Sequence, residues 1–189
     1  IVISLWQETP RCIWIGTDGG GINRFDPLTE TFTHYPTTRE DKITSICDFT
    51  PGKLLISVFS DGIYLFDPRT GAKTPFTIVN EAITDKLTQH GYAVYFHRNT
   101  PHTILLLGDH VYVYDLRTHS FSIASEEIKD LIVWGTLQAI ASEEERTFLF
   151  DSRRIYTLDH ATNHLQTLYV APPEITINSV AYDREKALF

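Results

Sequence analysis

A turn pattern that occurs four times constrains this chain more than any other feature. An aromatic residue or leucine is followed by aspartate, two further residues and threonine. An aspartate side chain can accept a hydrogen bond from the backbone two residues on, and a proline after it presets a type I turn. The pattern therefore predicts four hairpin turns, at Asp26/Thr29, Asp67/Thr70, Asp115/Thr118 and Asp159/Thr162.

Short apolar segments flank each turn, and they predict four strands in every unit. Four-stranded units that recur every roughly 40–50 residues are typical of β-propeller blades. The expected strands are 2–6, 12–16, 22–25 and 32–35; 43–47, 53–58, 63–66 and 73–77; 93–97, 103–107, 111–114 and 120–124; and 137–142, 146–150, 155–158 and 165–169.

We therefore expect an all-β fold, a partial β-propeller of four-stranded antiparallel blades. The blades are expected over 1–36, 37–78, 79–125 and 126–170, and 171–189 is expected to start a further blade. About four and a fraction blades do not close a ring, so the pattern predicts an arc of a larger, seven-bladed propeller, truncated at both ends.

Three consecutive glycines, Gly19, Gly20 and Gly21, could form either a phosphate-binding loop or a turn between strands. They align with the stretch that ends at Gly62, and a strand is expected to follow, whereas a phosphate loop needs a helix N-terminus. The sequence favours the turn. The predicted structural turn residues are Gly19, Gly20, Gly21 and Gly62, with Asp26, Asp67, Asp115 and Asp159.

Charge and motif content exclude several function classes. The formal net charge is −8 and no run of basic residues exceeds two, so we expect no direct contact with nucleic acid and no membrane contact by this fragment. The chain lacks Gly-x-Ser-x-Gly, His-Glu-x-x-His and Cys-x-x-Cys, so no catalytic residue, metal or cofactor is expected. Cys12 and Cys47 are either bridged or buried as thiols.

The first unit resembles the two-component regulator propeller repeat. Residues 13–27 read IWIGTDGGGINRFDP and residues 32–35 read FTHY, which is close to the pattern of that repeat. The second unit keeps Asp61-Gly62 and Phe66-Asp67-Pro68, while the third and fourth keep only the turn pattern. The resemblance covers the chain as architecture, and its first two units carry the identification.

This resemblance implies the periplasmic sensor of a hybrid two-component system of gut Bacteroidetes. The whole protein would have two propellers, an immunoglobulin-like domain, a membrane span, a histidine kinase, a receiver and a DNA-binding domain. It would be a homodimer that detects oligosaccharides and controls polysaccharide-utilisation genes. These residues would contribute ligand sensing and no catalysis. Two alternatives are a protein-interaction or dimerisation propeller without a small ligand, and an enzyme like the propeller lyases and lactonases.

One rim of the expected propeller collects the turns between second and third strands and the connections between blades. Binding groups concentrate on such loops over a rigid scaffold. Basic side chains there would pair with carboxylate or sulfate of an acidic glycan, and aromatic ones would stack on a sugar face. The alternative is a set of solvated charges and two core aromatics. The ligand-binding candidates are Arg39, Lys86, Tyr92, Trp134, Arg153 and Arg154.

Overall fold

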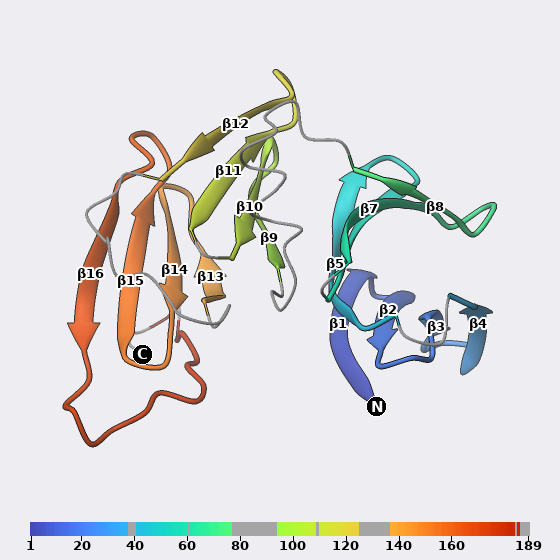
Figure 1. Ribbon diagram of the computed structural model, residues 1–189, viewed down its shortest axis with the longest axis horizontal. Helices are drawn as coiled ribbons and strands as arrows, with labels where there is room; N and C mark the ends of the chain where they lie inside the picture. The colour runs from blue at the N-terminus through green and yellow to red at the C-terminus, as the bar shows by residue number, and fades with distance from the viewer. Residues whose placement is uncertain are drawn as a thin grey trace. The chain divides into compact units, whose positions relative to one another are not determined.

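The computed structural model describes residues 1–37, 41–59, 61–76, 94–108, 110–124, 137–183 and 185. Its sixteen strands form four antiparallel four-stranded sheets, each built from consecutive strands (Figure 1). The expected all-β fold of four-stranded blades is confirmed. The chain divides into two compact units, Ile1–Phe96 and His97–Phe189. Within the described ranges no helix is long and apolar enough to cross a membrane.

The first unit holds two of the sheets. The first sheet consists of β1 (Val2–Thr9), β2 (Cys12–Thr17), β3 (Ile22–Asp26) and β4 (Thr31–Tyr35), and the second of β5 (Ile43–Thr50), β6 (Lys53–Val58), β7 (Gly62–Asp67) and β8 (Ala72–Pro75).

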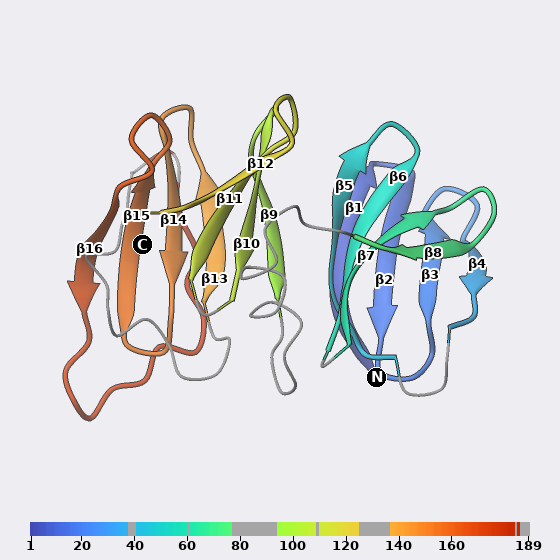
Figure 2. The ribbon, with the colours of Figure 1, turned by 45° about the horizontal axis from the view of Figure 1, so that its top comes forward.

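The other two sheets fall in the second unit, apart from the first two residues of β9. Within each sheet the strands lie side by side in chain order (Figures 1 and 2). No named strand lies among the described residues after Val170. The third sheet consists of β9 (Tyr95–Thr100), β10 (Thr103–Leu107), β11 (Val111–Asp115) and β12 (Ser120–Ile123), and the fourth of β13 (Gln138–Ser142), β14 (Arg146–Phe150), β15 (Arg154–Asp159) and β16 (Leu165–Val170).

The first strands of the first three sheets differ most from their expected bounds. β1 runs on to Thr9, because its pairing with β2 continues as far as Thr9 opposite Cys12. β9 starts later than expected and continues to Thr100, because hydroxyl hydrogen bonds between Thr100 and Thr103 close the turn into β10. In both cases strand pairing extends up to the hairpin, beyond the apolar run that predicted the strand.

The core of the first unit lies between its two sheets. Trp14 and Phe66 are 2% and 1% exposed and meet edge to face, with ring centroids 6.1 Å apart. Ser4 Oγ donates to the Ile43 carbonyl at 2.7 Å. Gly16 permits this close approach, because a Cβ there would lie 2.6 Å from the Ile43 oxygen. The sheets pack directly against each other.

The inner strands of the second unit are apolar along most of their length. Leu105, Leu106 and Tyr112 of the third sheet are fully buried, as are Leu149 and Tyr156 of the fourth. A strand buried on both faces reads as a continuous apolar run and does not alternate, as β10 and β14 do not.

The two cysteines are buried thiols, and no disulfide joins them. Cys12 Sγ accepts a hydrogen bond from Arg24 Nε at 3.2 Å and lies 3.2 Å from Glu8 Oε2. The same carboxylate oxygen accepts from Trp14 Nε1 at 2.9 Å. Burial raises the pKa of the Cys12 thiol, so the group is held as a protonated donor to Glu8.

Candidate functional site

The four hairpin turns share one hydrogen bond and one backbone conformation. In each turn the aspartate Oδ1 accepts from the amide two residues on, at 2.9 Å from Leu28, 2.9 Å from Arg69, 2.7 Å from Arg117 and 3.1 Å from Ala161. Four residues after each aspartate the backbone is left-handed. Those residues are Glu30 (φ 54°), Gly71 (φ 74°), His119 (φ 53°) and Asn163 (φ 53°).

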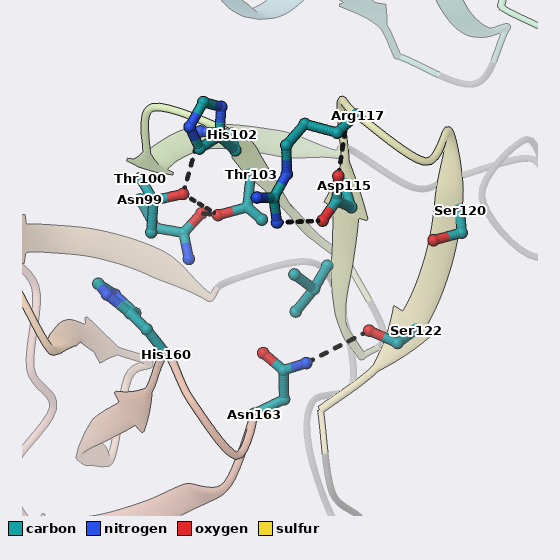
Figure 3. Close-up of a pocket in the computed structure, with 11 residues that line it drawn as sticks. Asn99, Thr100, His102, Thr103, Asp115, Arg117, Ser120, Ser122, His160 and Asn163 are labelled. Carbon is teal, nitrogen blue, oxygen red and sulfur yellow. Dashed lines mark hydrogen bonds and ion pairs between the residues drawn. The ribbon is translucent and has the colours of Figure 1, made fainter.

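The third and fourth of these turns border a polar cavity of about 380 Å³ in the second unit (Figure 3). Two walls come from the third sheet: the β9–β10 hairpin on one side, and β11 with β12 on the other. The turn between β15 and β16 supplies the remaining wall. The lining residues are Asn99, Thr100, His102, Thr103, Val113, Asp115, Arg117, Ser120, Ser122, His160 and Asn163.

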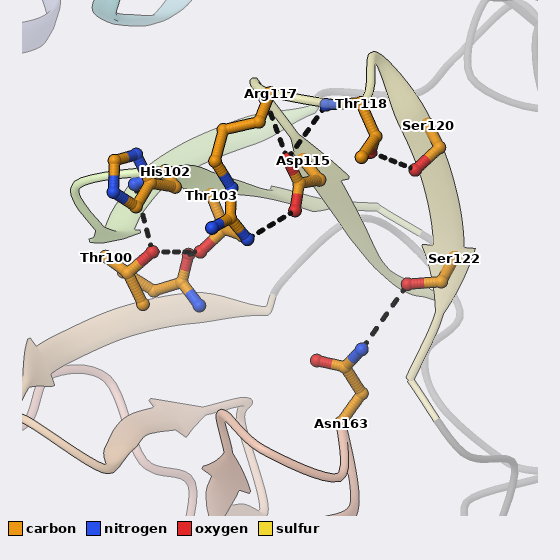
Figure 4. A network of polar contacts seen from close by, with 10 residues as sticks. Thr100, His102, Thr103, Asp115, Arg117, Thr118, Ser120, Ser122 and Asn163 are labelled. Atoms are coloured by element: carbon orange, nitrogen blue, oxygen red, sulfur yellow. Dashed lines mark hydrogen bonds and ion pairs between the residues drawn. The ribbon is translucent and has the colours of Figure 1, made fainter.

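A chain of hydrogen bonds fixes the side chains of the β9–β10 hairpin (Figure 4). The His102 amide donates to Thr100 Oγ1 at 3.1 Å, and the Thr100 and Thr103 hydroxyls lie 2.6 Å apart. Thr103 Oγ1 donates to Asn99 Oδ1 at 2.8 Å. Asn99 is only 7% exposed. Because its Oδ1 accepts from Thr103, its NH₂ group is the end of the amide that faces the cavity (Figure 3).

The opposite wall carries an ion pair that neutralises itself. Arg117 Nη2 donates to Asp115 Oδ2 at 3.2 Å, and the Arg117 amide donates to Oδ1 at 2.7 Å. The hydrogen bonds that Asp115 accepts from the Arg117 side chain and from backbone amides lower the pKa of Asp115 to about 2. The aspartate is therefore ionised and its charge is matched by the guanidinium, so the pair adds no net charge to the cavity.

Asn163 brings the fourth sheet to the cavity. Its Nδ2 lies 3.4 Å from Ser122 Oγ on β12, a long hydrogen bond, and its Oδ1 is turned toward the space between Asn99 and His160 (Figure 3). Asparagine tolerates the left-handed backbone of this position better than most residues. Glycine occupies the equivalent place at Gly71.

His160 connects the cavity to a buried hydrogen-bond chain. His97 Nε2 lies 2.8 Å from Ser142 Oγ, which lies 2.7 Å from Thr147 Oγ1, which lies 2.8 Å from His160 Nε2. His160 Nδ1 is 3.2 Å from the carbonyl of Glu144, which can only accept. A neutral His160 therefore donates from Nδ1 to this carbonyl and accepts at Nε2 from the Thr147 hydroxyl. Each hydroxyl of the hydrogen-bond chain then donates toward His160, and the first donor is the Nε2–H of His97.

His97 is neutral at neutral pH. Burial, and secondly the nearby His160, lowers the pKa of His97 to about 4. Thr147 at the centre of the chain is fully buried. These hydrogen bonds thus join β9 of the third sheet to β13 and β14 of the fourth.

Two predicted ligand contacts are adjacent: Arg153 lies on the turn before β15, and Arg154 is the first residue of β15. Their amides both donate to Asp151 Oδ1 at 2.7 Å. The Arg153 guanidinium donates to the carbonyls of Pro173 at 2.8 Å and Ala171 at 3.2 Å. Arg153 therefore anchors the segment after β16, and its binding role stays a prediction. The other candidates, Arg39, Lys86, Tyr92 and Trp134, lie outside the described residues.

In the first unit, a lysine of β8 is also engaged internally. Lys73 Nζ lies 2.9 Å from Asp41 Oδ2 and 4.4 Å from the centre of the Tyr64 ring. Tyr64 donates to Asp61 Oδ2 at 2.7 Å, and burial together with this bond raises the pKa of Tyr64 to about 12. These groups stabilise one another and form no exposed cationic patch.

The glycine loop lies between β2 and β3. Gly19 and Gly21 have φ angles of 75° and 69°, Gly20 separates them, and Thr17 Oγ1 donates to the Gly21 carbonyl at 2.8 Å. A Cβ on Gly21 would lie 2.4 Å from the carbonyl oxygen of Tyr35. Because a strand follows, the loop has no helix N-terminus with which to hold a phosphate. Gly62, with φ 142°, begins β7.

The lining of the cavity offers hydrogen bonds to a polar ligand. Among the described residues, hydroxyl, amide and imidazole groups line it together with one ion pair and one apolar residue, Val113. Among the residues that the structure describes, no group of three or more His, Cys, Asp or Glu side chains could hold a metal ion. This cavity was not predicted from the sequence, because the turn pattern of the bordering hairpins indicated a purely structural role. The feature of the sequence that could have indicated it is Asn163, an asparagine at the turn position where the second hairpin has Gly71.

No family model matches the sequence, and no curated protein matches it. Solved structures do resemble it. The extracellular domain assigned to the hybrid two-component system BT4673 of B. thetaiotaomicron has a TM-score of 0.66 at 17% identity, over 90% of this chain and 24% of that one. The corresponding domain of BT3049 has a TM-score of 0.64 at 15% identity, over 95% of this chain and 23% of that one.

An auxiliary nutrient binding protein from Bacteroides thetaiotaomicron has a TM-score of 0.64 at 12% identity, over 98% of this chain and 55% of that one. The chain thus spans about a quarter of the length of the two sensor domains it resembles. At these identities the likeness is one of fold. It confirms the expected resemblance to extracellular sensor domains of Bacteroides two-component systems at that level.

Proposed function

We propose that this chain is the extracytoplasmic, ligand-sensing part of a hybrid two-component sensor histidine kinase and response regulator. It detects oligosaccharides and signals across the membrane to control polysaccharide-utilisation genes. The observation that carries this proposal is the likeness of nearly the whole chain to extracellular domains of such systems. The repeat sequence of residues 13–27 and 32–35 supports it independently.

The described residues support a binding role without catalysis. The cavity of the second unit offers donors and acceptors held by a rigid scaffold, and its walls come from two sheets. A ligand that contacts both walls would restrict their relative freedom, which is the physical requirement for a sensor. The remaining blades, an immunoglobulin-like domain, the kinase and a second copy of the chain belong to the full-length protein in this proposal.

A thermal-shift screen against neutral and acidic oligosaccharides tests the proposal. A ligand at 100 times its Kd stabilises the native state by about 2.7 kcal/mol. For a chain of this size that corresponds to a rise in Tm of about 5–10 °C. Mannitol at equal weight concentration controls for the general stabilisation that polyols produce. A folded chain whose Tm no oligosaccharide raises beyond the mannitol control would contradict the sensor proposal.

A second candidate, protein contact, is favoured by exposed apolar residues at the start of β1. Val2, Ile3 and Leu5 are 56%, 39% and 66% exposed. Contiguous exposed apolar side chains mark interaction surfaces. If these residues join two copies, light scattering after size exclusion gives a dimer that Leu5→Lys converts to a monomer. A monomer at all concentrations would remove this candidate.

A further inference from the structure

We propose that the cavity between the third sheet and the β15–β16 turn binds an uncharged sugar ring, which Asn99 and Asn163 hold from opposite sides. This inference rests on the proposed function and names the site and the class of ligand. It places binding at the hairpin end of the second unit, whereas the rim predicted from the sequence gathers the turns between second and third strands.

Asn99 and Asn163 offer complementary hydrogen-bonding groups to the cavity. Asn99 Oδ1 accepts a hydrogen bond from Thr103, and no described residue accepts one from the Asn99 NH₂ group. Asn163 Nδ2 donates a hydrogen bond to Ser122, and no described residue donates one to Asn163 Oδ1. One wall therefore offers a donor and the other an acceptor, both turned toward the same space (Figure 3). A sugar hydroxyl can serve as partner to either group, because it both donates and accepts.

The charge of the cavity also favours a neutral ligand. Of the lining residues that the structure describes, Arg117 is the only arginine or lysine, and it is paired with Asp115. An anionic ligand would have to compete with that carboxylate for the guanidinium. An uncharged ligand keeps the ion pair intact and loses only water on binding, so the cavity favours neutral sugars over uronates.

The size and surface of the cavity suit a small polar ligand. A volume of about 380 Å³ is at the lower end of the range for small-molecule sites, roughly 300–1,000 Å³. Among the described residues that line the cavity, Val113 is the only aliphatic one, and none is phenylalanine, tyrosine or tryptophan. An apolar ligand would leave the polar groups of the lining unpaired. A small polyhydroxylated ring satisfies them and places its C–H face on Val113.

The test is a titration of the ¹⁵N-labelled chain with glucose, galactose, mannose, xylose and arabinose, and with glucuronate and galacturonate. The readout is the side-chain NH₂ resonances of Asn99 and Asn163. We expect saturable shifts of both with at least one of the five neutral sugars, and weaker binding of the two uronates. No shift of these resonances with any neutral sugar, or tighter binding of a uronate, would overturn the proposal.

The matched variants are Asn163→Gly and Glu30→Gly. Both residues have the same left-handed backbone in equivalent turns, but Glu30 belongs to the first unit and is not among the residues that line the cavity. Loss of one neutral hydrogen bond weakens binding about fivefold, so Asn163→Gly should raise Kd by that factor and Glu30→Gly should leave it unchanged. Equal affinity of wild type and Asn163→Gly would overturn the assignment.

The outcomes separate this site from the proposed function. If an oligosaccharide raises Tm while the Asn99 and Asn163 amides stay unperturbed, the sensor proposal survives and this site is wrong. If the amides respond to a neutral sugar while no oligosaccharide raises Tm, the site stands and the sensing of oligosaccharides fails.

Discussion

Lowering the pH should destabilise the second unit through His97. Its pKa is about 4 in the folded chain, against an ordinary value near 6.5 in the unfolded chain. Because the folded pKa is depressed, the unfolded state binds the proton first, and stability falls as the pH drops from about 6.5 toward 4. These two values give a loss of about 2 kcal/mol between pH 7 and pH 5, and about 3 kcal/mol in all.

Urea unfolding at pH 7 and pH 5 measures this loss, with far-UV circular dichroism as the signal. Hydrogen–deuterium exchange of β14 peptides assigns the transition to the second unit. The variant His97→Gln keeps a side-chain donor for Ser142 Oγ but does not titrate, so its stability should change about 2 kcal/mol less over the same range. His34→Gln, which alters an exposed histidine of the first unit, is the control and should behave as wild type.

Few carboxylates titrate between pH 7 and pH 5, so this window isolates the histidine contribution. The account is refuted if His97→Gln shows the same pH dependence as wild type. It is also refuted if stability in the second unit rises as the pH falls, since that would mean that the folded chain binds the proton more tightly than the unfolded chain.

Three further substitutions test the fold. Gly16→Ala forces a Cβ to within 2.6 Å of the Ile43 oxygen and should destabilise the first unit by about 2–4 kcal/mol in urea, and a value under 1 kcal/mol would contradict the close packing of the two sheets. Gly71→Ala meets no steric clash but must adopt φ 74°, so we expect a loss of about 1–2 kcal/mol, and a neutral result would contradict the left-handed turn. Arg153→Ala should speed amide exchange in the segment after β16 while leaving β14 protected, and unchanged exchange there would show that the guanidinium does not anchor it.

The fold could be predicted from the sequence because its signals are local. Apolar runs such as 103–107 and 146–150 mark buried strands, and they coincide with β10 and β14. The aspartate of each turn has its hydrogen-bond partner only two residues away, as in Asp26 with Leu28, so short-range pattern is sufficient. The repeat then gives the number of strands in each sheet.

The candidate site could not be predicted in the same way, because its residues meet only after two sheets pack. Asn99 is in the third repeat and Asn163 in the fourth, and no spacing in the sequence relates them. Charge alone does not locate a site either. The Arg153 guanidinium donates to backbone carbonyls of its own chain, and its contact with a ligand stays a prediction. A sequence shows that a cation is present, but it does not show which group neutralises it.

Hydrogen–deuterium exchange of the chain, with and without the oligosaccharide that raises Tm most, tests the central claim most directly. The account predicts protection in the peptides that carry Asn99 to Thr103 and His160 to Asn163, because both walls of the cavity contact the ligand. Protection confined to the turn that carries Arg153 and Arg154, or no change in any peptide at saturating ligand, would contradict it.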